Sequence, residues 1–323
     1  MPAVNVIAVS GVSGNIAQGI VKGLRAGRSF FRIVGLDSSA DNVGFYMVDR
    51  GIPMPLVRES YYVDRLIEVL IEQSAELYLL GVDSEVSIVS AARARIESES
   101  GCRVVVCDDS FVRSATDKLE TARMLSEAGL RAPKTLPGDT AADAVLDQLG
   151  LPLIAKPRRG HGSHGFERIE SKTALIEWQA RAGAGYCVQE YLPGTEFTCA
   201  LLYDRRRSLR DHVCFERRLE WGTTMEARVV RVEPLEQLIR RFGELLPAEG
   251  PINLQLRMDR EGCPVIFEIN PRFSGTTAFR VACGFNDPLR VALHYLRDEP
   301  IMPVKARPLK IFRYFEHWVV PIQ

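Results

Sequence analysis

The chain has 323 residues, of which 46% are apolar and 25% charged, so it can bury a proper core and is not a disordered protein. Its 41 Lys and Arg residues equal its 41 Asp and Glu residues, which argues against a general polyanion binder and therefore against a nucleic-acid partner. The length predicts two or three domains of ordinary size.

The N-terminal segment, the apolar runs and the cysteines indicate the cellular compartment. The N-terminal stretch MPAVNVIAVSG lacks the basic and long apolar regions of a signal peptide. No apolar run approaches the roughly 18 residues of a membrane-spanning helix, so we expect no membrane partner. The seven cysteines form no C-x-x-C pair and lie mostly in apolar segments, which is typical of free thiols in a cytosolic protein. We therefore expect a cytoplasmic protein without a metal–thiolate site.

Residues 4–107 alternate strand-like apolar runs with helical patterns. This order predicts right-handed crossovers and a parallel sheet with helices on both faces. The strand-like runs are VNVIAV, FRIVGLD, ELYLLGVD and RVVVCD. The helical patterns are GNIAQGIVKGLRAG, YYVDRLIEVLIEQS and EVSIVSAARARIESES.

The rest of the chain has a different character. Asp109 and Ser110 open a helical stretch that contains TDKLETARMLSEAGL and stops near Gly129, and APKTLP follows as a connector. Residues 138–190 predict a small α+β unit with strands at LPLIAKP, GFERIE and YCVQEY and a helix near Ser171. From residue 191 the predicted strands are longer and antiparallel, with helices at EPLEQLIRRFGELL and NDPLRVALHYL.

A glycine loop, SGVSGNIAQG, follows the first predicted strand and opens the first helix. Gly11, Gly14 and Gly19 lie where a Rossmann fold holds a pyrophosphate, and Asp37 ends the next strand, where such folds bind the ribose. The spacing is not G-x-G-x-x-G, however, and any tight turn from strand to helix favours glycine. An NAD(P) site therefore stays open as an alternative.

A second glycine loop, PRRGHGSHG, follows Lys156 at the end of a predicted strand. Gly162 and Ser163 lie within it, between its two histidines, and two arginines precede them. Glycines let backbone N–H groups approach an anion, and lysine supplies a point charge, so we predict a phosphate contact. Lys118, at a helix start, becomes a second candidate cation only because Lys156 and the glycine loop are also present. The alternative is a surface hairpin with solvated charges.

The segment VQEYLPGTEF joins the small unit to the longer strands. Residues 189–192 (Gln189, Glu190, Tyr191 and Leu192) offer an extended backbone to a purine edge. The carboxylate of Glu196 beyond them can accept from ribose hydroxyls. An ordinary domain connector is the alternative.

INLQLRMDREGCPVIFEINPRFSG predicts a hairpin. A tight turn at Arg260-Glu261 would place Asn253 opposite Glu268. Alternation puts Glu268, Asn270 and Arg272 on one face, and Phe267, Ile269 and Phe273 on the other.

The polar face of this hairpin points to a metal. Glu268, Asn270 and Gln255 supply oxygen ligands with little charge, which suits Mg²⁺ that shares its shell with substrate phosphates. Arg272 suits a phosphate oxygen. Arg217, Arg218 and the loop at residues 222–224 precede the hairpin and could hold a substrate carboxylate; a solvated basic strand end is the alternative.

These motifs together resemble the ATP-grasp superfamily, most closely its carbamoyl-phosphate-synthase large-subunit-like branch, which includes amino-acid ligases of pyrrolysine-biosynthesis type. The resemblance covers nearly the whole chain. It implies a mixed α/β and α+β fold in three domains: a Rossmann-like pre-ATP-grasp domain (1–110), a lid subdomain with a linker helix (111–190) and a core subdomain with an antiparallel sheet and the metal site (191–323). In such a fold the first-domain glycines would border an acceptor substrate.

The resemblance also implies roles. Lys118, Lys156, Gly162 and Ser163 would contact ATP phosphates, residues 189–192 adenine, and Glu196 the ribose. Glu268 and Asn270 would bind Mg²⁺, with Gln255 as a ligand or neighbour. Arg272, Lys156 and Arg218 would serve the reaction, in which a small-molecule carboxylate becomes an acyl phosphate that an amine, or less often a thiol, displaces.

The chain also departs from the family pattern. Gln255 stands where many members carry an acid, and no second ATP-grasp half is present. Two rival functions therefore remain, an NAD(P)-dependent oxidoreductase and a non-catalytic nucleotide sensor. An apolar helix face in the first domain would allow a homodimer.

Overall fold

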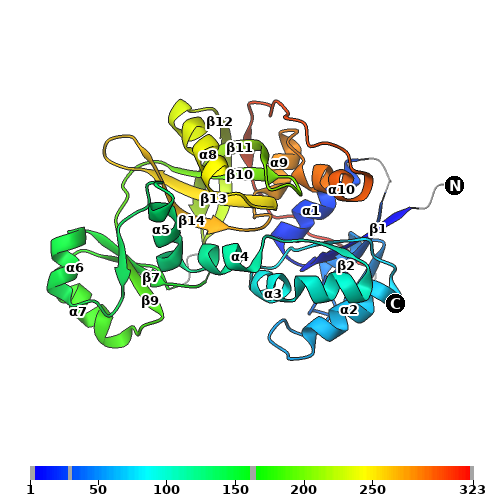
Figure 1. The fold of residues 1–323 in the computed structure, drawn as a ribbon, viewed down its shortest axis with the longest axis horizontal. Coiled ribbons are helices and arrows are strands. Elements are labelled where there is room, and N and C mark those ends of the chain that lie inside the picture. Colours follow the sequence, from blue (N-terminus) through cyan, green and yellow to red (C-terminus); the bar gives the residue numbers. More distant parts are fainter. Residues whose placement is uncertain (1–3, 28–30, 161–164, 321–323) are drawn as a thin grey trace.

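A computed structural model describes residues 4–27, 31–160 and 165–320, and the first part of the chain forms a parallel sheet flanked by helices (Figure 1). The strand order is β3-β2-β1-β4-β5, and every neighbouring pair is parallel, as the sequence predicted. The strands are β1 (Asn5–Ser10), β2 (Phe31–Asp37), β3 (Arg50–Pro53), β4 (Leu77–Leu79) and β5 (Arg103–Val105). The helices are α1 (Asn15–Arg25), the 3₁₀ turn η1 (Val43–Tyr46), α2 (Tyr62–Glu72) and α3 (Asp83–Ser100). The sequence missed β3 and η1, which are too short to show a period.

The linker is two helices, α4 (Asp109–Thr116) and α5 (Lys118–Glu127), so the prediction of one continuous helix was wrong. Asp117 between them is extended, with φ −110° and ψ 116°, and its carboxylate accepts from the backbone N–H of Leu119 at 3.1 Å. The side chain of Asp117 accepts from the first backbone amides of α5 and so caps the start of that helix. Because the capping residue is extended, α4 ends before it.

The second unit is a small antiparallel sheet covered by two helices, seen at the left of Figure 1. Its strand order is β6-β9-β7-β8. The strands are β6 (Thr135–Pro137), β7 (Leu153–Pro157), β8 (Glu167–Ile169) and β9 (Tyr186–Glu190), and the helices are α6 (Ala142–Leu149) and α7 (Lys172–Arg181). The second half of the predicted connector APKTLP is therefore strand β6. It lies at the sheet edge, the position where a strand tolerates proline.

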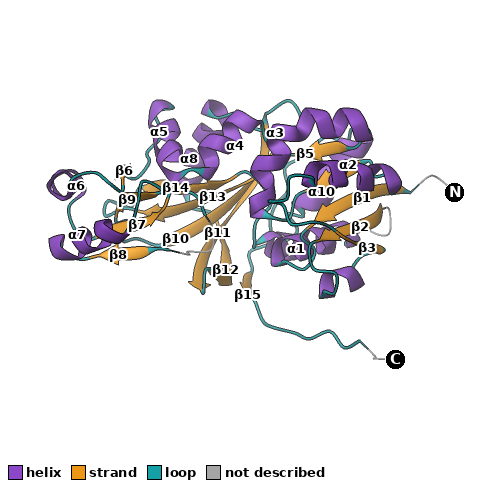
Figure 2. Cartoon of the chain, turned by 90° about the horizontal axis from the view of Figure 1, so that it is seen from below, coloured by secondary structure: helices purple, strands orange, loops and turns teal. Residues whose placement is uncertain are grey.

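The third unit is a larger antiparallel sheet in the order β14-β13-β10-β11-β12-β15, which confirms the antiparallel prediction (Figure 2). Its strands are β10 (Glu196–Tyr203), β11 (Leu209–Glu220), β12 (Thr223–Val230), β13 (Gly250–Met258), β14 (Pro264–Asn270) and β15 (Lys310–Phe312). Its helices are α8 (Glu233–Leu245), α9 (Thr277–Ala282) and α10 (Asp287–Arg297), of which the sequence missed the short α9.

The register of the β13–β14 hairpin differs from the prediction. Gln255, rather than Asn253, lies opposite Glu268. The connecting loop is one residue longer than expected, with Gly262 at φ +79°, and a bulge opposite Gln255–Leu256 adds a further residue, Phe267. These two insertions shift the pairing by two residues, which keeps Gln255 and Glu268 on one face but changes the partners. The prediction that Phe267 lies on the opposite face was wrong, because the bulge lets it line the same cavity as Glu268.

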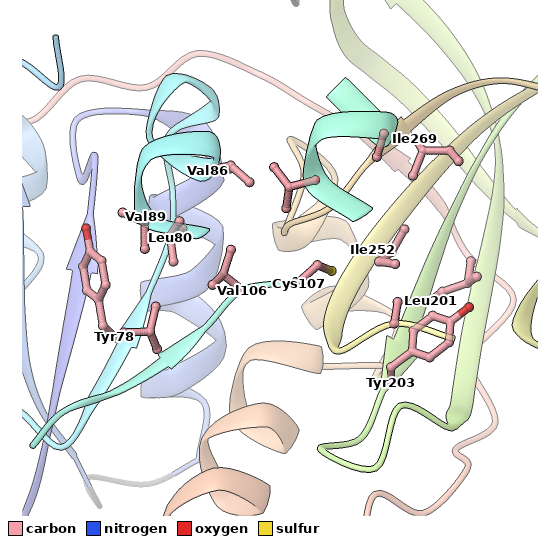
Figure 3. Close-up of a cluster of buried hydrophobic side chains, with 14 of the residues drawn as sticks. Tyr78, Leu80, Val86, Val89, Val106, Cys107, Leu201, Tyr203, Ile252 and Ile269 are labelled. Carbon is pink, nitrogen blue, oxygen red and sulfur yellow. The ribbon is translucent and has the colours of Figure 1, made fainter. Parts of the chain in front are cut away.

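The first and third units share one hydrophobic core. Figure 3 shows buried side chains of the parallel unit, such as Tyr78 and Val106, continuing through Cys107 to Tyr203 and Ile252 of the antiparallel sheet. Because one core spans both units, the loops of the parallel sheet are held in place against the end of β14.

A buried ion pair ties α9 to α10. Arg280 and Asp287 are both almost fully buried, with 3.2 Å between Nε and Oδ2. We expect Asp287→Ala to lower the free energy of unfolding by about 3–5 kcal/mol, because it leaves an arginine charge uncompensated in the core. Urea unfolding measures this. Asp298, the exposed partner of Arg205, is the control, and Asp298→Asn should lower the free energy of unfolding far less. Equal losses of unfolding free energy in the two variants would contradict the assignment of Arg280 and Asp287 as a buried ion pair.

Candidate functional site

A cavity of about 420 Å³ lies between the four-stranded sheet and the six-stranded sheet. Side chains of β7, β8, β9, β10, β11, β13 and β14 line it, and α5 contributes Lys118. The lining residues are Lys118, Ile154, Lys156, Pro157, Gly160, Phe166, Arg168, Gln189, Glu190, Tyr191, Leu192, Glu196, Leu219, Gln255, Arg257, Phe267 and Glu268. The structure therefore brings most of the predicted site residues into one place.

Lys156 is a buried cation on the cavity wall, with 8% of its surface exposed. Its Nζ donates to Oε1 of Gln189 at 2.7 Å and lies 5.5 Å from the centre of the Phe267 ring. Burial lowers the pKa of Lys156 to about 8, although the nearby groups of Cys187 and Glu268 act in the opposite direction. Little negative charge of the protein compensates the charge of this lysine. We expect this for a cation whose partner is an anionic ligand.

Lys118 reaches the same cavity from α5. Its Nζ donates to the carbonyl of Gly160 at 3.0 Å, and its backbone N–H donates to the carbonyl of Arg158 at 2.9 Å. Arg158 itself bonds to Asp117, with Nη2 2.9 Å from Oδ2, so it supports the helix start and does not line the cavity. The predicted Gly162 and Ser163 lie outside the described residues.

Residues 189–192 line the cavity on the side of β9. Gln189 is held at both ends, because its Nε2 also donates to Oγ1 of Thr135 at 2.8 Å. Glu190 pairs with the backbone of Lys134, accepting from its N–H through Oε1 at 2.9 Å. The guanidinium of Arg168 stacks on Tyr191, 4.5 Å from the ring centre. This segment is a fixed wall with apolar and backbone surface.

Glu196 lies between two arginines. Its Oε1 accepts from Nη2 of Arg217 at 2.6 Å, and its Oε2 accepts from Nη2 of Arg257 at 2.6 Å. Arg217 also donates to Oε1 of Gln255 at 2.8 Å. The predictions for this cavity omitted Arg257, although strand alternation places it on the face of Gln255.

One carboxylate oxygen of Glu268 accepts hydrogen bonds from two side-chain amides. Nε2 of Gln255 and Nδ2 of Asn270 approach its Oε1 at 3.3 and 3.1 Å. Within residues 4–27, 31–160 and 165–320, Oε2 has no protein partner and no three His, Cys, Asp or Glu side chains gather to hold a metal. One carboxylate flanked by amides fits a Mg²⁺ ion that arrives with phosphates and fits a tightly held protein-only metal poorly.

Three predicted residues of the described structure, Asn270, Arg272 and Arg218, do not line the cavity. Asn270, at the end of β14, is buried and contacts Glu268. Arg272 is 8% exposed and pairs with Asp83 of α3, while its Nη2 donates to Oδ1 of Asn270 at 3.1 Å. It therefore lies between β14 and the parallel unit, outside the cavity lining. Arg218 points away on β11, with 57% of its side chain exposed, and pairs with Glu220 and Glu226.

A second cavity, of about 590 Å³, lies on the parallel unit at the first glycine loop. Gly11, Gly14, Asp37 and Asp83 contribute to its lining. Both oxygens of Asp37 accept from the loops beside it, Oδ2 from the N–H of Ser13 at 2.8 Å and Oδ1 from that of Ser39 at 3.0 Å. The carboxylate that would bind a ribose in a dinucleotide site thus stabilises the turns beside it.

Comparison with known proteins agrees with this geometry. Residues 184–316 match the family model described as "ATP-grasp in the biosynthetic pathway with Ter operon". The fold is similar to N5-carboxyaminoimidazole synthetase of Staphylococcus aureus complexed with ADP, with a TM-score of 0.74 at 13% identity over 94% of this chain and 80% of that one. It is also similar to an L-amino acid ligase of Bacillus licheniformis, with a TM-score of 0.69 at 16% identity over 91% and 74%.

The chain therefore has the fold of these two neighbours, and its residues 184–316 resemble an ATP-grasp domain. Among curated relatives, it is 30% identical over 179 residues to the D-alanine–D-alanine ligase of Nitrosospira multiformis, and 37% identical over 93 residues to that of Ectopseudomonas mendocina. These matches cover 50% and 27% of this chain, and 58% and 30% of the relatives, which is less than two thirds of their length.

No helix among the described residues is both long enough and apolar enough to cross a membrane.

The buried Lys156 has a consequence for stability. Its pKa of about 8 in the folded chain lies below its ordinary value of 10.5, so the unfolded chain binds more protons between these values. The cost of burying the cation is present below pH 8 and disappears as the pH rises towards 10.5. We expect Lys156→Met to be about 1–2 kcal/mol more stable than wild type at pH 7, after the lost bond to Gln189 is counted.

Urea unfolding at pH 7, 8.5 and 10 tests this, since the advantage of Lys156→Met should shrink with rising pH. Lys172→Met is the control, because Lys172 is an exposed lysine of the same unit. An advantage that stays constant across the three pH values would contradict the burial of the charge.

Proposed function

We propose that the chain is an ATP- and Mg²⁺-dependent carboxylate–amine ligase that acts on amino acids or small peptides. One observation carries the proposal: Lys156, residues 189–192, Glu196 and Glu268 line a single cavity although 112 positions separate the first from the last. The relatives and the amino-acid-ligase neighbour are named as ligases, which supports the same class of reaction.

The cavity suits a nucleotide whose phosphates lie near the lysines. Lys118 and Lys156 supply positive charge at one end, and Gly160 begins the glycine loop beside them. Leu192 and Ile154 offer apolar surface to a base at the wall formed by β9. Glu196 is the candidate partner of the ribose hydroxyls.

Glu268, with Asn270 and Gln255 beside it, would hold Mg²⁺ together with the phosphates. When bound, the ion would neutralise charge on the transferring phosphoryl group. The amide groups that contact Glu268 keep its carboxylate directed to this place. The low charge of this set suits an ion that is shared with the substrate.

The reaction would take two steps. An oxygen of the substrate carboxylate attacks the γ-phosphorus, the bond to ADP breaks, and an acyl phosphate forms. A nitrogen then attacks the acyl carbon and phosphate leaves. We assign the carboxylate contact to Arg217, which faces the cavity side of β11, instead of Arg218. Arg272 lies between the two cavities and would meet the acyl phosphate only after leaving Asp83.

The second cavity would hold the amine, at the glycine loop of the first unit. The boundaries 1–110, 111–190 and 191–323 remain our proposal for the domains, the cytoplasm for the location and a homodimer for the assembly. Two rivals, an oxidoreductase using Gly11 and Asp37 and a sensor without turnover, predict different ligands or no turnover.

Ligand-dependent melting separates these candidates. We expect saturating ATP with Mg²⁺ to raise the melting temperature by about 5 °C and NAD(P)H to leave it unchanged. Glu268→Ala should lose most of the rise that depends on Mg²⁺, whereas Glu216→Ala, at an exposed partner of Arg228, should keep it. A rise with NAD(P)H and none with ATP would refute the proposal. Phosphate release that requires both an acid and an amine excludes the sensor.

Two adjacent arginines provide a matched pair. Arg217→Lys removes the fork that joins Glu196 to Gln255, and we expect it to lower kcat/KM for the carboxylate at least tenfold. Arg218→Lys changes an exposed residue on the opposite side of the same strand and should alter kcat/KM less than twofold. Steady-state phosphate release measures both, and equal effects would contradict the assignment of Arg217.

A further inference from the structure

A buried carboxyl group that the proposed reaction has not used lies beneath the second cavity. Glu85, in the first turn of α3, has none of its surface exposed. Its Oε2 accepts from the hydroxyl of Ser10, and its Oε1 accepts from those of Tyr62 and Tyr78. Among the ion pairs of the described residues, none joins Glu85 to a cation. A buried acid that only hydroxyl groups satisfy lowers the free energy of unfolding, so a structural role alone does not account for it.

Two of the three residues that carry these hydroxyl groups also line the cavity. Ser10 and Tyr62 are among its lining residues, whereas Tyr78 lies behind them and is fully buried. Ser10 Oγ donates to Glu85 and accepts from the N–H of Gly81 at 3.0 Å. A hydroxyl oxygen has two acceptor sites, so one remains on Ser10 for a donor inside the cavity.

The backbone fixes this arrangement. Gly81 follows β4 and passes so close to β1 that an added Cβ would lie 2.3 Å from the carbonyl oxygen of Ser10. Only glycine allows this approach, which brings the N–H of Gly81 to the serine. The next residue but one, Asp83, is already occupied by Arg272.

The groups that face Glu85 are all uncharged. They are Ser10 from β1, Tyr62 from α2 and Tyr78 from β4, while Asp83 on its own helix pairs with Arg272. Burial raises the pKa of Glu85 above its ordinary value, and the three hydroxyl groups act against that rise. A carboxylate with raised proton affinity is a better base at neutral pH.

We propose that Glu85, acting through Ser10 and Tyr62, accepts the proton that a basic amine must lose before it attacks the acyl phosphate. The inference rests on the proposed function and specifies the acceptor as a primary amine that enters the second cavity as an ammonium ion. Ser10 and Tyr62 contact this amine, and Glu85 is the proton store behind them.

The protons and bonds balance. The ammonium group gives one proton to Ser10 Oγ while the serine proton moves to Oε2 of Glu85. The neutral nitrogen attacks the acyl carbon, the C–N bond forms, and the bond from that carbon to the phosphate oxygen breaks. The second nitrogen proton leaves with the phosphate. A thiol acceptor would leave the tightly bonded carboxyl group without this task.

Two acceptors of different basicity test the path. Hydroxylamine is mostly unprotonated at pH 7 and needs no base, so hydroxamate formation with each amino acid as carboxylate reports the first step and acyl transfer alone. The twenty amino acids, ammonia, ethylamine and putrescine are then compared as acceptors. Amide formation is measured with the acceptor that reacts fastest. Glu85→Gln and Ser10→Ala should slow amide formation about 100-fold and hydroxamate formation less than threefold. Raising the pH should restore the amide rate of both variants.

Tyr78→Phe is the matched control, because it removes a hydroxyl from the same carboxyl group but not from the cavity. It should slow both reactions less than threefold. Tyr62→Phe, which tests the second route, replaces Glu85→Gln if that variant does not fold in a melting experiment. Equal loss of both products in all variants, unchanged amide formation, or hydroxamate formation without turnover of any amine would overturn the inference. Absence of hydroxamate with every amino acid would instead reject the proposed function.

Discussion

The bulge at Phe267 decides which side chains of the β13–β14 hairpin reach the cavity between the two antiparallel sheets. In a regular strand Phe267 and Glu268 would point to opposite faces, but the additional residue lets both line the cavity. The phenylalanine ring then approaches Lys156 from the other sheet, and Glu268 stays opposite Gln255. One inserted residue thus places an aromatic face beside a cation and a carboxylate beside an amide.

From that hairpin a chain of polar contacts leads to the second cavity. Glu268 contacts Asn270, Asn270 accepts from Arg272, and Arg272 pairs with Asp83. In the other direction Gln255 contacts Arg217, which pairs with Glu196. Buried arginines are stable only when carboxylates or amides surround them. The same contacts that satisfy these charges therefore join the two cavities, and the shared hydrophobic core keeps them aligned.

The sequence predicted the sheets and several of the residues that line the first cavity, because hydrophobic period and residue type are local properties. Lys156, residues 189–192 and Glu268 could be found this way. The hairpin register could not, because neither loop length nor a bulge changes the alternation of a single strand. The sequence could not separate Arg217 from Arg218 for a related reason: apolar residues precede both, at Phe215 and Cys214, so the pattern does not tell the faces apart.

The first glycine loop shows why a motif and a site must be separated. Its glycines and Asp37 match a dinucleotide loop in kind, yet the oxygens of Asp37 bind the N–H groups of adjacent turns. What distinguishes this unit is a carboxyl group beneath the loop, with hydroxyl groups leading from it to the cavity. The sequence gives no sign of it, since Glu85 resembles any acid in the first turn of a helix. Only the fold reveals that this acid is buried without a cation, and that condition raises its affinity for a proton.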